Sequence, residues 1–275
     1  MEGDGVTIRV ASTDEELRFY FESAEREGWM PGPHDVAAFR LIDPDGMLVA
    51  VDASGTVVGG IVAAAYDSSY GFIGLYIVRP DWRGRGVGLQ LWRRALDHLG
   101  ARTIGLDGVP AQQSNYAKWG FVKAYDNVRY VVHGPACACG GTASTAAATA
   151  AAAEPAPALP GTADAAACRL VCPAADVPRA ALEQYDRALH PAPRPTLLHA
   201  WLRLPGTASA ALCTSDGTVV GFGAVRQAAG GGWRVGPLAA DTPAHAARLL
   251  EHLRTAVPQH ACMSLDVPAA NVCAL

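Results

Sequence analysis

The stretch GLYIVRPDWRGRGVGLQLWRRAL, residues 74–96, decides how the N-terminal half of the chain folds. An apolar run leads into alternating glycines, and the residues after them place their apolar side chains on one helical face. That face consists of Leu91, Trp92, Ala95, Leu96 and Leu99. The order of these features predicts a strand, a glycine-rich turn and a helix.

The glycine-rich turn, RGRGVG at residues 83–88, has the character of an anion site. The first N–H groups of a helix lack intrahelical partners, and the helix dipole adds positive potential there. Gly84, Gly86 and Gly88 leave room for a ligand to approach the backbone, while Arg83 and Arg85 add positive charge. A phosphate-bearing ligand is the natural occupant, and a plain strand-to-helix connection is the alternative.

Two common nucleotide motifs do not fit this turn. A nucleotide-hydrolysing P-loop needs a lysine and a hydroxyl after its glycines, whereas Leu89 and Gln90 follow Gly88 here. A dinucleotide-binding turn needs G-x-G-x-x-G, and Leu89 stands where the third glycine is required. The class of ligand therefore has to be inferred from the residues on either side of the turn.

Strand-like and helical segments alternate through residues 1–133, which predicts an α/β (α+β) domain. Thr13 and Glu16 form a capping-box pattern at the start of a helix over residues 13–27. The other expected helices cover residues 34–42, 89–99 and 111–119. The expected strands lie at residues 6–12, within 46–66 as a hairpin, and at 70–78, 102–109 and 121–132.

Residues 134–167 are rich in Ala, Pro and Gly and lack aromatic and basic residues, which predicts a disordered linker. Residues 168–275 then repeat the order of the first half. The segment SDGTVVGFGAV at 215–225 echoes ASGTVVGGIVA at 53–63, which favours a divergent duplication. The predicted domains are therefore 1–133 and 168–275.

Composition restricts the classes of function. The 275 residues carry a formal net charge of -4 and a pI near 6.0, so no global nucleic-acid footprint is present. No stretch is long and apolar enough to span a bilayer, and the acidic start lacks a secretory signal, so we expect a cytoplasmic protein. Seven irregularly spaced cysteines predict free thiols rather than a disulfide framework, and we expect no metal site.

Residues 78–96 resemble the acetyl-CoA-binding motif of the GNAT superfamily of N-acetyltransferases. Its form R/Q-x-x-G-x-G/A is matched by Arg83, Gly86 and Gly88, after a strand that ends in Val78-x-Pro80. YAKWGF at residues 116–121 matches the family's Y-x-x-x-G-F. The resemblance covers about residues 6–132.

A subgroup with a second GNAT-like C-terminal domain is similar in further segments. These are MPGPHD at 30–35, GLDGVPAQQSNY at 105–116, GWRVGPLAAD at 232–241 and SLDVPAAN at 264–271. The resemblance implies two tandem GNAT-like domains, each a mixed twisted sheet flanked by helices, the second divergent and truncated.

The resemblance also implies an acetyl-CoA site. Its pyrophosphate would be bound by the backbone of Arg83, Gly84, Arg85, Gly86, Val87 and Gly88. Its pantetheine amides would pair with the strand edge at Ile77 and Val78, and Tyr116 would protonate the leaving thiolate. Relatives carry an asparagine at the position of Val109, so Gln112, Gln113 or Asn115 would have to replace that contact.

The general base and the acceptor site stay open at this point. Base candidates are Asp107, the pair His34 and Asp35, Asp67, or a water chain between them. Asp107 is equally readable as a turn cap. His34 and Asp35 are also candidate substrate ligands, and an N-cap pair at the start of a helix is the alternative for them. Possible acceptor-pocket aromatics, which fit the core as well, are Trp29, Tyr70, Phe72 and Tyr76.

The second half lacks the R-x-x-G-x-G motif, and GPLAADTPAH at 236–245 stands in its place, so we expect one CoA site per chain. This half ends before a closing helix and strand and is either shortened or completed by another segment. It would cover the acceptor site or form a homodimer surface. The leading function is transfer of acetyl to a primary amine of a small molecule or peptide, and the alternatives are a non-catalytic acyl-CoA-binding module or a scaffold.

Overall fold

The computed structural model describes residues 5–132 and 167–271. The predicted linker, 134–167, lies outside these ranges except for its last residue. The described residues form two compact units. The first unit takes in the chain up to Ala124 together with Leu189–Trp201, and the second takes in the remainder from Tyr125 onward.

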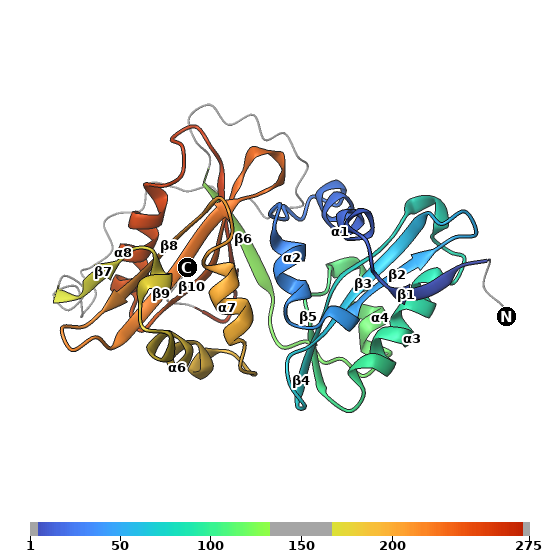
Figure 1. The fold of residues 1–275 in the computed structure, drawn as a ribbon, viewed down its shortest axis with the longest axis horizontal. Coiled ribbons are helices and arrows are strands. Elements are labelled where there is room, and N and C mark those ends of the chain that lie inside the picture. Colours follow the sequence, from blue (N-terminus) through green and yellow to red (C-terminus); the bar gives the residue numbers. More distant parts are fainter. Residues whose placement is uncertain (1–4, 133–166, 272–275) are drawn as a thin grey trace. The chain divides into compact units, whose positions relative to one another are not determined.

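The first unit is built on a five-stranded sheet in the order β1-β2-β3-β4-β5 (Figure 1). Only β4 and β5 run parallel, and the other neighbours are antiparallel. The strands are β1 (Thr7–Val10), β2 (Met47–Val51), β3 (Val57–Ala65), β4 (Tyr70–Val78) and β5 (Thr103–Leu106). The helices are α1 (Asp14–Arg26), α2 (Asp35–Arg40), α3 (Val87–Leu99), α4 (Gln113–Ala117) and α7 (Pro195–Trp201).

Helix α1 begins where the sequence predicts. The Thr13 hydroxyl accepts from the Glu16 N–H at 3.2 Å, and the Glu16 carboxylate accepts from the Thr13 N–H at 3.2 Å, which completes the capping box. Arg9 forms an ion pair with the same carboxylate. The cap therefore also joins the start of α1 to β1.

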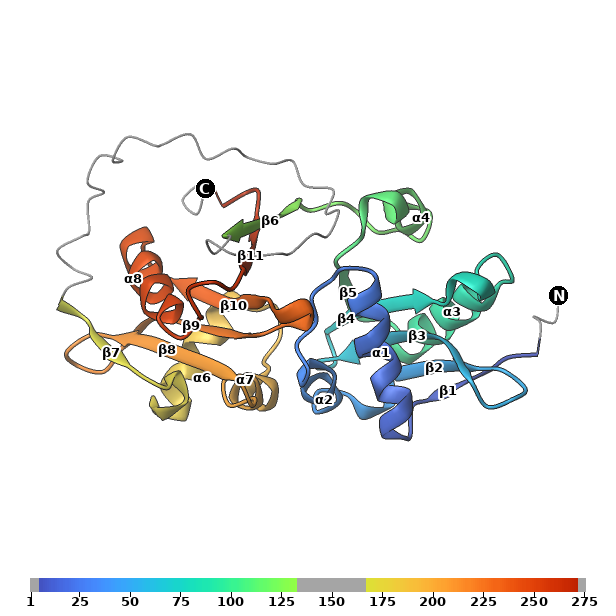
Figure 2. The same ribbon diagram turned by 90° about the horizontal axis from the view of Figure 1, so that it is seen from above.

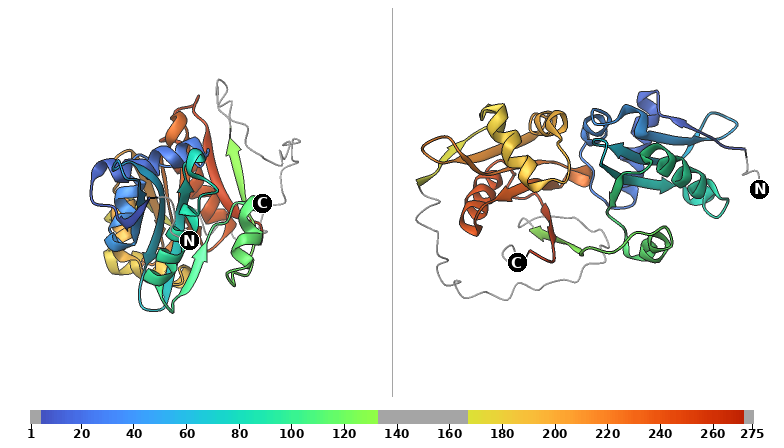
Figure 3. Two further views of the ribbon diagram at one scale, coloured as in Figure 1. Left: turned by 90° about the vertical axis from the view of Figure 1, so that its right-hand side faces the viewer. Right: turned by 90° about the horizontal axis from the view of Figure 1, so that it is seen from below.

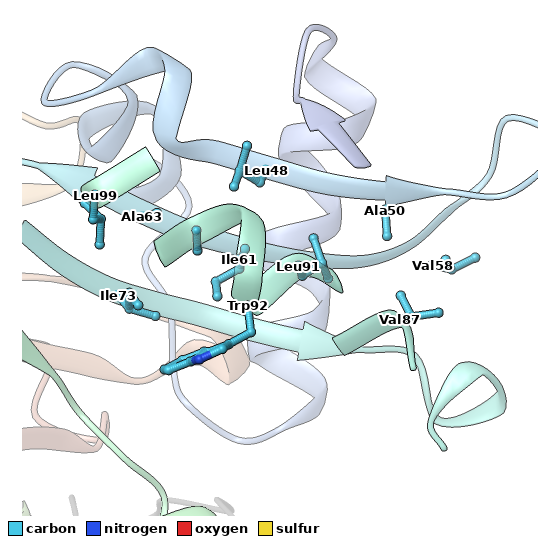
Figure 4. Packing of buried hydrophobic residues seen from close by; sticks show 11 residues of the cluster. Leu48, Ala50, Val58, Ile61, Ala63, Ile73, Val87, Leu91, Trp92 and Leu99 are labelled. Carbon is cyan, nitrogen blue, oxygen red and sulfur yellow. The ribbon is translucent and has the colours of Figure 1, made fainter. Parts of the chain in front are cut away.

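The sheet of the first unit is covered on both faces, because successive strand residues point in opposite directions. Leu48 and Ala50 of β2 pack with α3 residues, whereas Met47, Val49 and Val51 pack with residues of α1 and α2. Figures 2 and 3 show α1 and α3 on these opposite faces. The α3 layer of the core, from Leu48 to Leu99, is drawn in Figure 4.

The second unit contains a six-stranded sheet in the order β6-β11-β10-β9-β8-β7, in which only β10 and β11 run parallel. The strands are β6 (Asn127–Val132), β7 (Arg169–Val171), β8 (Thr207–Cys213), β9 (Val219–Gln227), β10 (Trp233–Ala240) and β11 (Met263–Pro268). The helices are α6 (Arg179–Leu189) and α8 (Pro243–Arg254), whose first residues lie near the ends of β7 and β10 in the chain.

Strand β6 departs from the sequence prediction. Residues 121–132 were expected to close the first sheet, but β6 pairs antiparallel with β11 over its whole length, from Asn127–Pro268 to Val132–Met263 (Figure 2). Arg129 adds a bidentate ion pair with Asp266 across this pairing. The expectation about the first sheet is wrong, and β6 is the segment that completes the second sheet.

A second segment also crosses the predicted limits. Residues Leu189–Trp201, which lie in the C-terminal half of the sequence, belong to the first unit. Trp201 stacks on Phe39 with ring centroids 5.5 Å apart, and His190 stacks on Tyr66 at 5.1 Å. These aromatic contacts tie α7 and the turn before it to α2 and to the end of β3.

The cysteines of the described ranges are in two states. Cys168, Cys172 and Cys213 are free thiols, whereas Cys262 is disulfide-bonded, so the prediction of thiols is wrong at Cys262. In residues 5–132 and 167–271, no group of three His, Cys, Asp or Glu side chains is arranged to hold a metal ion. None of the helices found there is both long and apolar enough to cross a membrane.

Candidate active site

The two parallel strands of the first unit separate at one point. Pairing of β4 with β5 runs from Tyr70–Thr103 to Ile73–Leu106 and stops there. Beyond it, the edge of β4 from Gly74 to Val78 has no strand partner on that side within the described residues. This edge therefore presents backbone groups without a strand partner to an extended ligand, although the Val78 carbonyl already accepts from Arg83 Nε at 2.9 Å.

A β-bulge lies at the point of separation. Between the pairs Gly60–Ile77 and Val62–Gly74, β4 contains one residue more than β3. Leu75 sits in the bulge with φ +46°, a left-handed value that is uncommon for a non-glycine residue. The extra residue reverses which face the following side chains meet.

The reversal moves Tyr76 away from the other aromatics expected at an acceptor pocket. Before the bulge, the Gly71 position faces Leu99 of α3, so Tyr70 faces the opposite side of the sheet. After the bulge, Tyr76 packs with the α3 side of the core. The structure thus does not bring Tyr70 and Tyr76 to one site, because period-two counting fails across a bulge.

The glycine-rich loop gives α3 an open start. A short 3₁₀ turn, Pro80–Trp82, follows β4, and Gly84 and Gly86 then take φ values of +79° and +80°. Gly86 is the N-cap residue of α3, and no side chain caps the helix. The first N–H groups of α3 therefore remain available to an anion, as the sequence predicts.

The arginines and Val87 of the loop have structural contacts. Arg83 Nε donates to the Val78 carbonyl at 2.9 Å, and its guanidinium pairs with Glu27 at 2.6 Å. The Arg85 guanidinium lies 4.9 Å from the centroid of the Trp82 ring. The Val87 side chain is buried in the core. Only the backbone of Val87, and not its side chain, is thus placed to meet a ligand.

Tyr116 lies on α4, where its ring is held on three sides. Its centroid is 5.5 Å from that of Trp92 and 6.3 Å from that of Phe121. A Cβ at Gly108 would lie 3.0 Å from the ring, so the backbone at Gly108 approaches it closely. Burial raises the pKa of Tyr116, which keeps the hydroxyl protonated at neutral pH.

A pocket of about 180 Å³ opens beside Tyr116. Its lining residues come from β4, α3, α4 and the turns before and after α4. They are Tyr76, Leu89, Trp92, Gln112, Asn115, Tyr116 and Trp119. Gln112 and Asn115 are joined by a hydrogen bond of 2.6 Å, and both line the pocket, whereas Gln113 does not. Of the three proposed replacements for the asparagine contact, Gln112 and Asn115 therefore line this pocket.

Asp107 is the first residue after β5, directly beyond the last β4–β5 pair. Its neighbour Gly108 packs under the Tyr116 ring, so Asp107 and Tyr116 lie at the same end of β5. Of the base candidates, Asp107 is thus the one whose chain position adjoins Tyr116.

Asp67, another base candidate, holds the turn between β3 and β4. Its Oδ1 accepts from the Ser69 N–H, the Ser69 hydroxyl and the Tyr70 N–H at 2.7, 2.8 and 2.9 Å. Hydrogen bonds from Ser69, followed by that from Tyr70, lower the pKa of Asp67. This turn precedes β4, at the opposite end of the strand from the glycine loop.

The remaining candidates lie around the start of α2 and the start of β4. Asp35 is buried and accepts from the Gly32 N–H at 2.9 Å, whereas His34 is exposed. Trp29 is half-buried in the segment after α1. Tyr70 stacks with Tyr66 and with His190, each at 5.9 Å between ring centroids. Asp35 is the first residue of α2 and His34 is its N-cap residue, but the His34 side chain makes no capping hydrogen bond. The ring contacts of Tyr70 favour a packing role for it.

Sequence reasoning treated Trp92 only as a core residue of α3. In the structure it is the platform on which Tyr76 and Tyr116 both pack, at 5.6 and 5.5 Å. Its spacing in α3 is that of an ordinary buried residue, so the sequence carries no signal that separates Trp92 from Leu91.

In the second unit, the helix start and the strand-end carboxylate that correspond to those of the first unit already have partners within the protein. Helix α8 starts with Pro243, and the Thr242 hydroxyl accepts from the His245 N–H at 3.2 Å. Asp266 follows the last β10–β11 pair, as Asp107 follows the last β4–β5 pair. Burial acts to raise the pKa of Asp266, but ion pairs with Arg129 and Arg234 hold it below its usual range. A capped helix and a paired carboxylate fit the expectation of one CoA site per chain.

Comparison with known proteins agrees with this geometry. Residues 12–123 match the model of the acetyltransferase (GNAT) family, and residues 182–275 match that of an acetyltransferase (GNAT) domain. The protein is therefore a member of the GNAT family of acyltransferases and contains two GNAT domains in tandem.

Individual relatives extend over nearly the whole chain. Holothin acyltransferase from Pseudoalteromonas sp. (strain SANK 73390) is 27% identical over 259 residues, which cover 94% of this chain and 78% of that protein. A putative acetyltransferase from Pyrococcus horikoshii has a TM-score of 0.69 at 24% identity and covers 99% of this chain and 83% of its own. A tandem GNAT protein from the clavulanic acid biosynthesis pathway has a TM-score of 0.59 at 17% identity, with coverages of 97% and 91%. The two structures confirm the predicted fold.

Proposed function

We propose that the protein is an acetyl-CoA-dependent N-acetyltransferase that acts on a primary amine of a small molecule or a peptide. The observation that carries this proposal is the open start of α3 next to the free edge of β4 and the pocket at Tyr116. Phosphates need N–H donors, an amide-containing arm can pair with a strand edge, and a thiolate leaving group needs a proton donor. The three features meet these needs in the order in which they occur along CoA.

The binding roles follow from the backbone. The N–H groups from Gly84 to Gly88 would hold the pyrophosphate, and the β4 edge at Ile77 and Val78 would pair with the pantetheine amides. A backbone N–H near Val78 would polarise the acyl carbonyl oxygen. Bound acetyl-CoA supplies an acetyl group that is activated as a thioester.

Two side chains would move protons. The amine must be uncharged to attack, and Asp107 would accept its proton directly or through water. As the amine nitrogen bonds to the acyl carbon and the carbon–sulfur bond breaks, Tyr116 Oη would donate a proton to the departing sulfur. The proton that the acylated nitrogen loses would return to the tyrosine, directly or through water. Holding the amine next to the thioester contributes to the rate by proximity as well.

The acceptor is assigned only by class. The relative named holothin acyltransferase supports acyl transfer as the reaction and adds holothin to the acceptors worth testing. The second unit, in which the Thr242 hydroxyl caps the start of α8, would serve as a homodimer surface. The function would be exercised in the cytoplasm, without nucleic acid or membrane as partner.

A thiol-release assay tests the proposal. Full-length protein would be incubated with acetyl-CoA or longer acyl-CoA and with a panel of amines that includes holothin. Amine-dependent release of CoA, fastest with acetyl-CoA, is the expected result. Tight binding of acetyl-CoA with no turnover on any amine would instead support the non-catalytic acyl-CoA-binding alternative.

A further inference from the structure

Gly88, the third glycine of the loop, is needed for a different reason from Gly84 and Gly86. Gly84 and Gly86 have left-handed φ values and open space where a side chain would stand, whereas Gly88 is not among the residues with positive φ. A Cβ at Gly88 would lie 2.6 Å from the Tyr76 hydroxyl oxygen, and its next neighbours would be 3.5 Å away. The space at Gly88 is therefore taken by one atom, the Tyr76 oxygen.

The Tyr76 ring is held in place by its packing. Its centroid is 5.6 Å from that of Trp92, and the ring belongs to the α3 side of the core. Within residues 5–132 and 167–271, no hydrogen bond joins the Tyr76 hydroxyl to another group of the protein. Burial, and to a smaller extent the nearby Tyr116, raise the pKa of Tyr76 to about 12, so the hydroxyl keeps its proton at neutral pH.

The same pocket wall contains another donor without a protein partner. The indole Nε1 of Trp92 is buried and makes no hydrogen bond within the described ranges. Buried polar groups are normally satisfied, so the hydroxyl of the pocket-lining Tyr76, unpaired within the described residues, indicates a polar occupant, whereas the fully buried Trp92 Nε1 is not accessible to one.

Tyr76 stands between the two ends of the proposed ligand site. Its hydroxyl adjoins the first turn of α3, where the phosphates would bind, and its ring lines the pocket that also holds Tyr116. We infer that Tyr76 is a positioning residue that hydrogen-bonds the pantetheine arm of acyl-CoA, and that residue 88 is glycine because this hydroxyl needs the space. The inference rests on the proposed function and assigns a side chain to the arm in addition to the strand edge.

Two ligands separate a contact to the arm from a contact to the phosphates. Calorimetry on the full chain would compare CoA with adenosine 3′-phosphate 5′-diphosphate, which carries the phosphates but lacks the arm. Tyr76→Phe should raise the Kd of CoA by roughly 2–10-fold, the effect of one hydrogen bond, and leave that of the shorter ligand unchanged. Tyr125→Phe, at an exposed tyrosine of the second unit, is the matched control and should change neither.

The other outcomes are decisive in different ways. Equal weakening of both ligands, or no change in either, overturns the assignment of Tyr76 to the arm. If the unaltered protein binds neither ligand, the proposed function fails and not only this inference.

A thermal-unfolding cycle tests the reason for Gly88 without any ligand. In the natural background, Gly88→Ala should lower the Tm by roughly 2–4 °C, because the held Tyr76 ring has to move. In the Tyr76→Phe background the same change should be neutral or stabilising, since alanine favours a helix more than glycine does. A loss of Tm that is equal in both backgrounds would show that the Tyr76 oxygen is not what excludes a side chain at position 88.

Discussion

The surroundings of Tyr116, the residue proposed as the acid, favour its protonated form. Burial raises the pKa of Tyr116 and so favours its role as an acid, which has to hold a proton until the sulfur departs. The carboxyl equivalent to Asp107 in the second unit, Asp266, is bound by two arginines and is kept ionised. A Leu-Asp pair thus occurs where the parallel pairing ends in both units, and only the aspartate of the first unit is proposed to move a proton.

Replacement of Tyr116 by Phe should remove the acid and keep the ring packing on Trp92. We expect kcat to fall by roughly 10²-fold or more, with little change in the Kd of acetyl-CoA. Stopped-assay kinetics and calorimetry measure the two quantities. Equal losses in turnover and affinity would contradict the acid role.

The pH dependence of turnover tests the same group in another way. An acid acts in its protonated form, so activity falls as pH rises through its pKa. Because burial raises the pKa of Tyr116, this decline should begin above the ordinary tyrosine value of about 10. A pH–rate profile of the Tyr116→Phe variant should lack the decline, and its persistence would assign it to another group.

Substitutions at Gly86 test whether the loop from Gly84 to Gly88 binds the pyrophosphate through its positive potential. Asn and Asp have the same shape and both tolerate the left-handed φ of +80° better than other side chains do. We expect Gly86→Asn to retain measurable CoA binding and Gly86→Asp to abolish it, because a carboxylate repels the pyrophosphate at the start of α3. Retained CoA binding in Gly86→Asp, measured by calorimetry, would refute the loop assignment.

At the scale of elements, the sequence predicts those segments well whose cause is local. The helix start at Thr13 depends on its own capping box, and the strand at 70–78 and the helix after the glycines depend on their own periodicity. The predicted helix over 111–119 is shorter, since the structure has a 3₁₀ turn at Pro110–Gln112 and α4 at Gln113–Ala117. Pro110 fits the first position of a 3₁₀ turn and gives no signal of how far the helix continues.

The bulge in β4 is a feature that strand periodicity does not predict. Strand periodicity places Tyr70, Phe72 and Tyr76 on one face, and the extra residue at Leu75 moves Tyr76 to the other. Nothing in the apolar run from 70 to 78 marks this insertion. The acceptor pocket predicted from these aromatics therefore combined residues from two faces of the sheet.

The capping box of α1 provides a stability prediction. Arg9, followed by the N–H groups of Ser12 and Thr13, lowers the pKa of the Glu16 carboxyl to about 2 against the effect of burial. A lowered pKa stabilises the fold above the unfolded value of about 4.3, and this contribution is lost as pH falls toward 2. Glu16→Gln should lower the free energy of unfolding by about 1 kcal/mol at pH 7 and by less near pH 2.

Denaturant unfolding at several pH values measures this effect. Glu22→Gln, at the exposed i,i+4 pair with Arg26 on the same helix, is the matched control and should have a small effect at every pH. A Glu16→Gln effect that does not change between pH 7 and pH 2 would show that the ionised carboxylate is not the stabilising group.

At the scale of the whole molecule, chain order and unit composition differ. The sequence predicts two domains from its low-complexity segment, and two units exist, but β6 and Leu189–Trp201 each lie in the unit of the other half. Sequence periodicity identifies β6 as a strand without indicating its neighbour, because partner choice depends on long-range hydrogen bonds. The bidentate pair of Arg129 with Asp266 is one such long-range contact.

Hydrogen exchange tests the placement of β6. Its backbone amides should exchange as slowly as those of β11, with which they pair. Arg129→Met, which keeps the aliphatic stem but removes the ion pair, should speed exchange in β6 and leave β2 of the first unit unchanged. Fast exchange of residues 127–132 in the unaltered protein would contradict the pairing.

The central claim is that the protein has one acyl-CoA site, formed by the glycine loop of the first unit. Calorimetric titration of the full chain with acetyl-CoA tests it most directly. We expect saturation at one ligand per chain in the natural protein and no binding heat in the Gly86→Asp variant. Saturation at two ligands per chain, or unchanged binding in the Gly86→Asp variant, would contradict it.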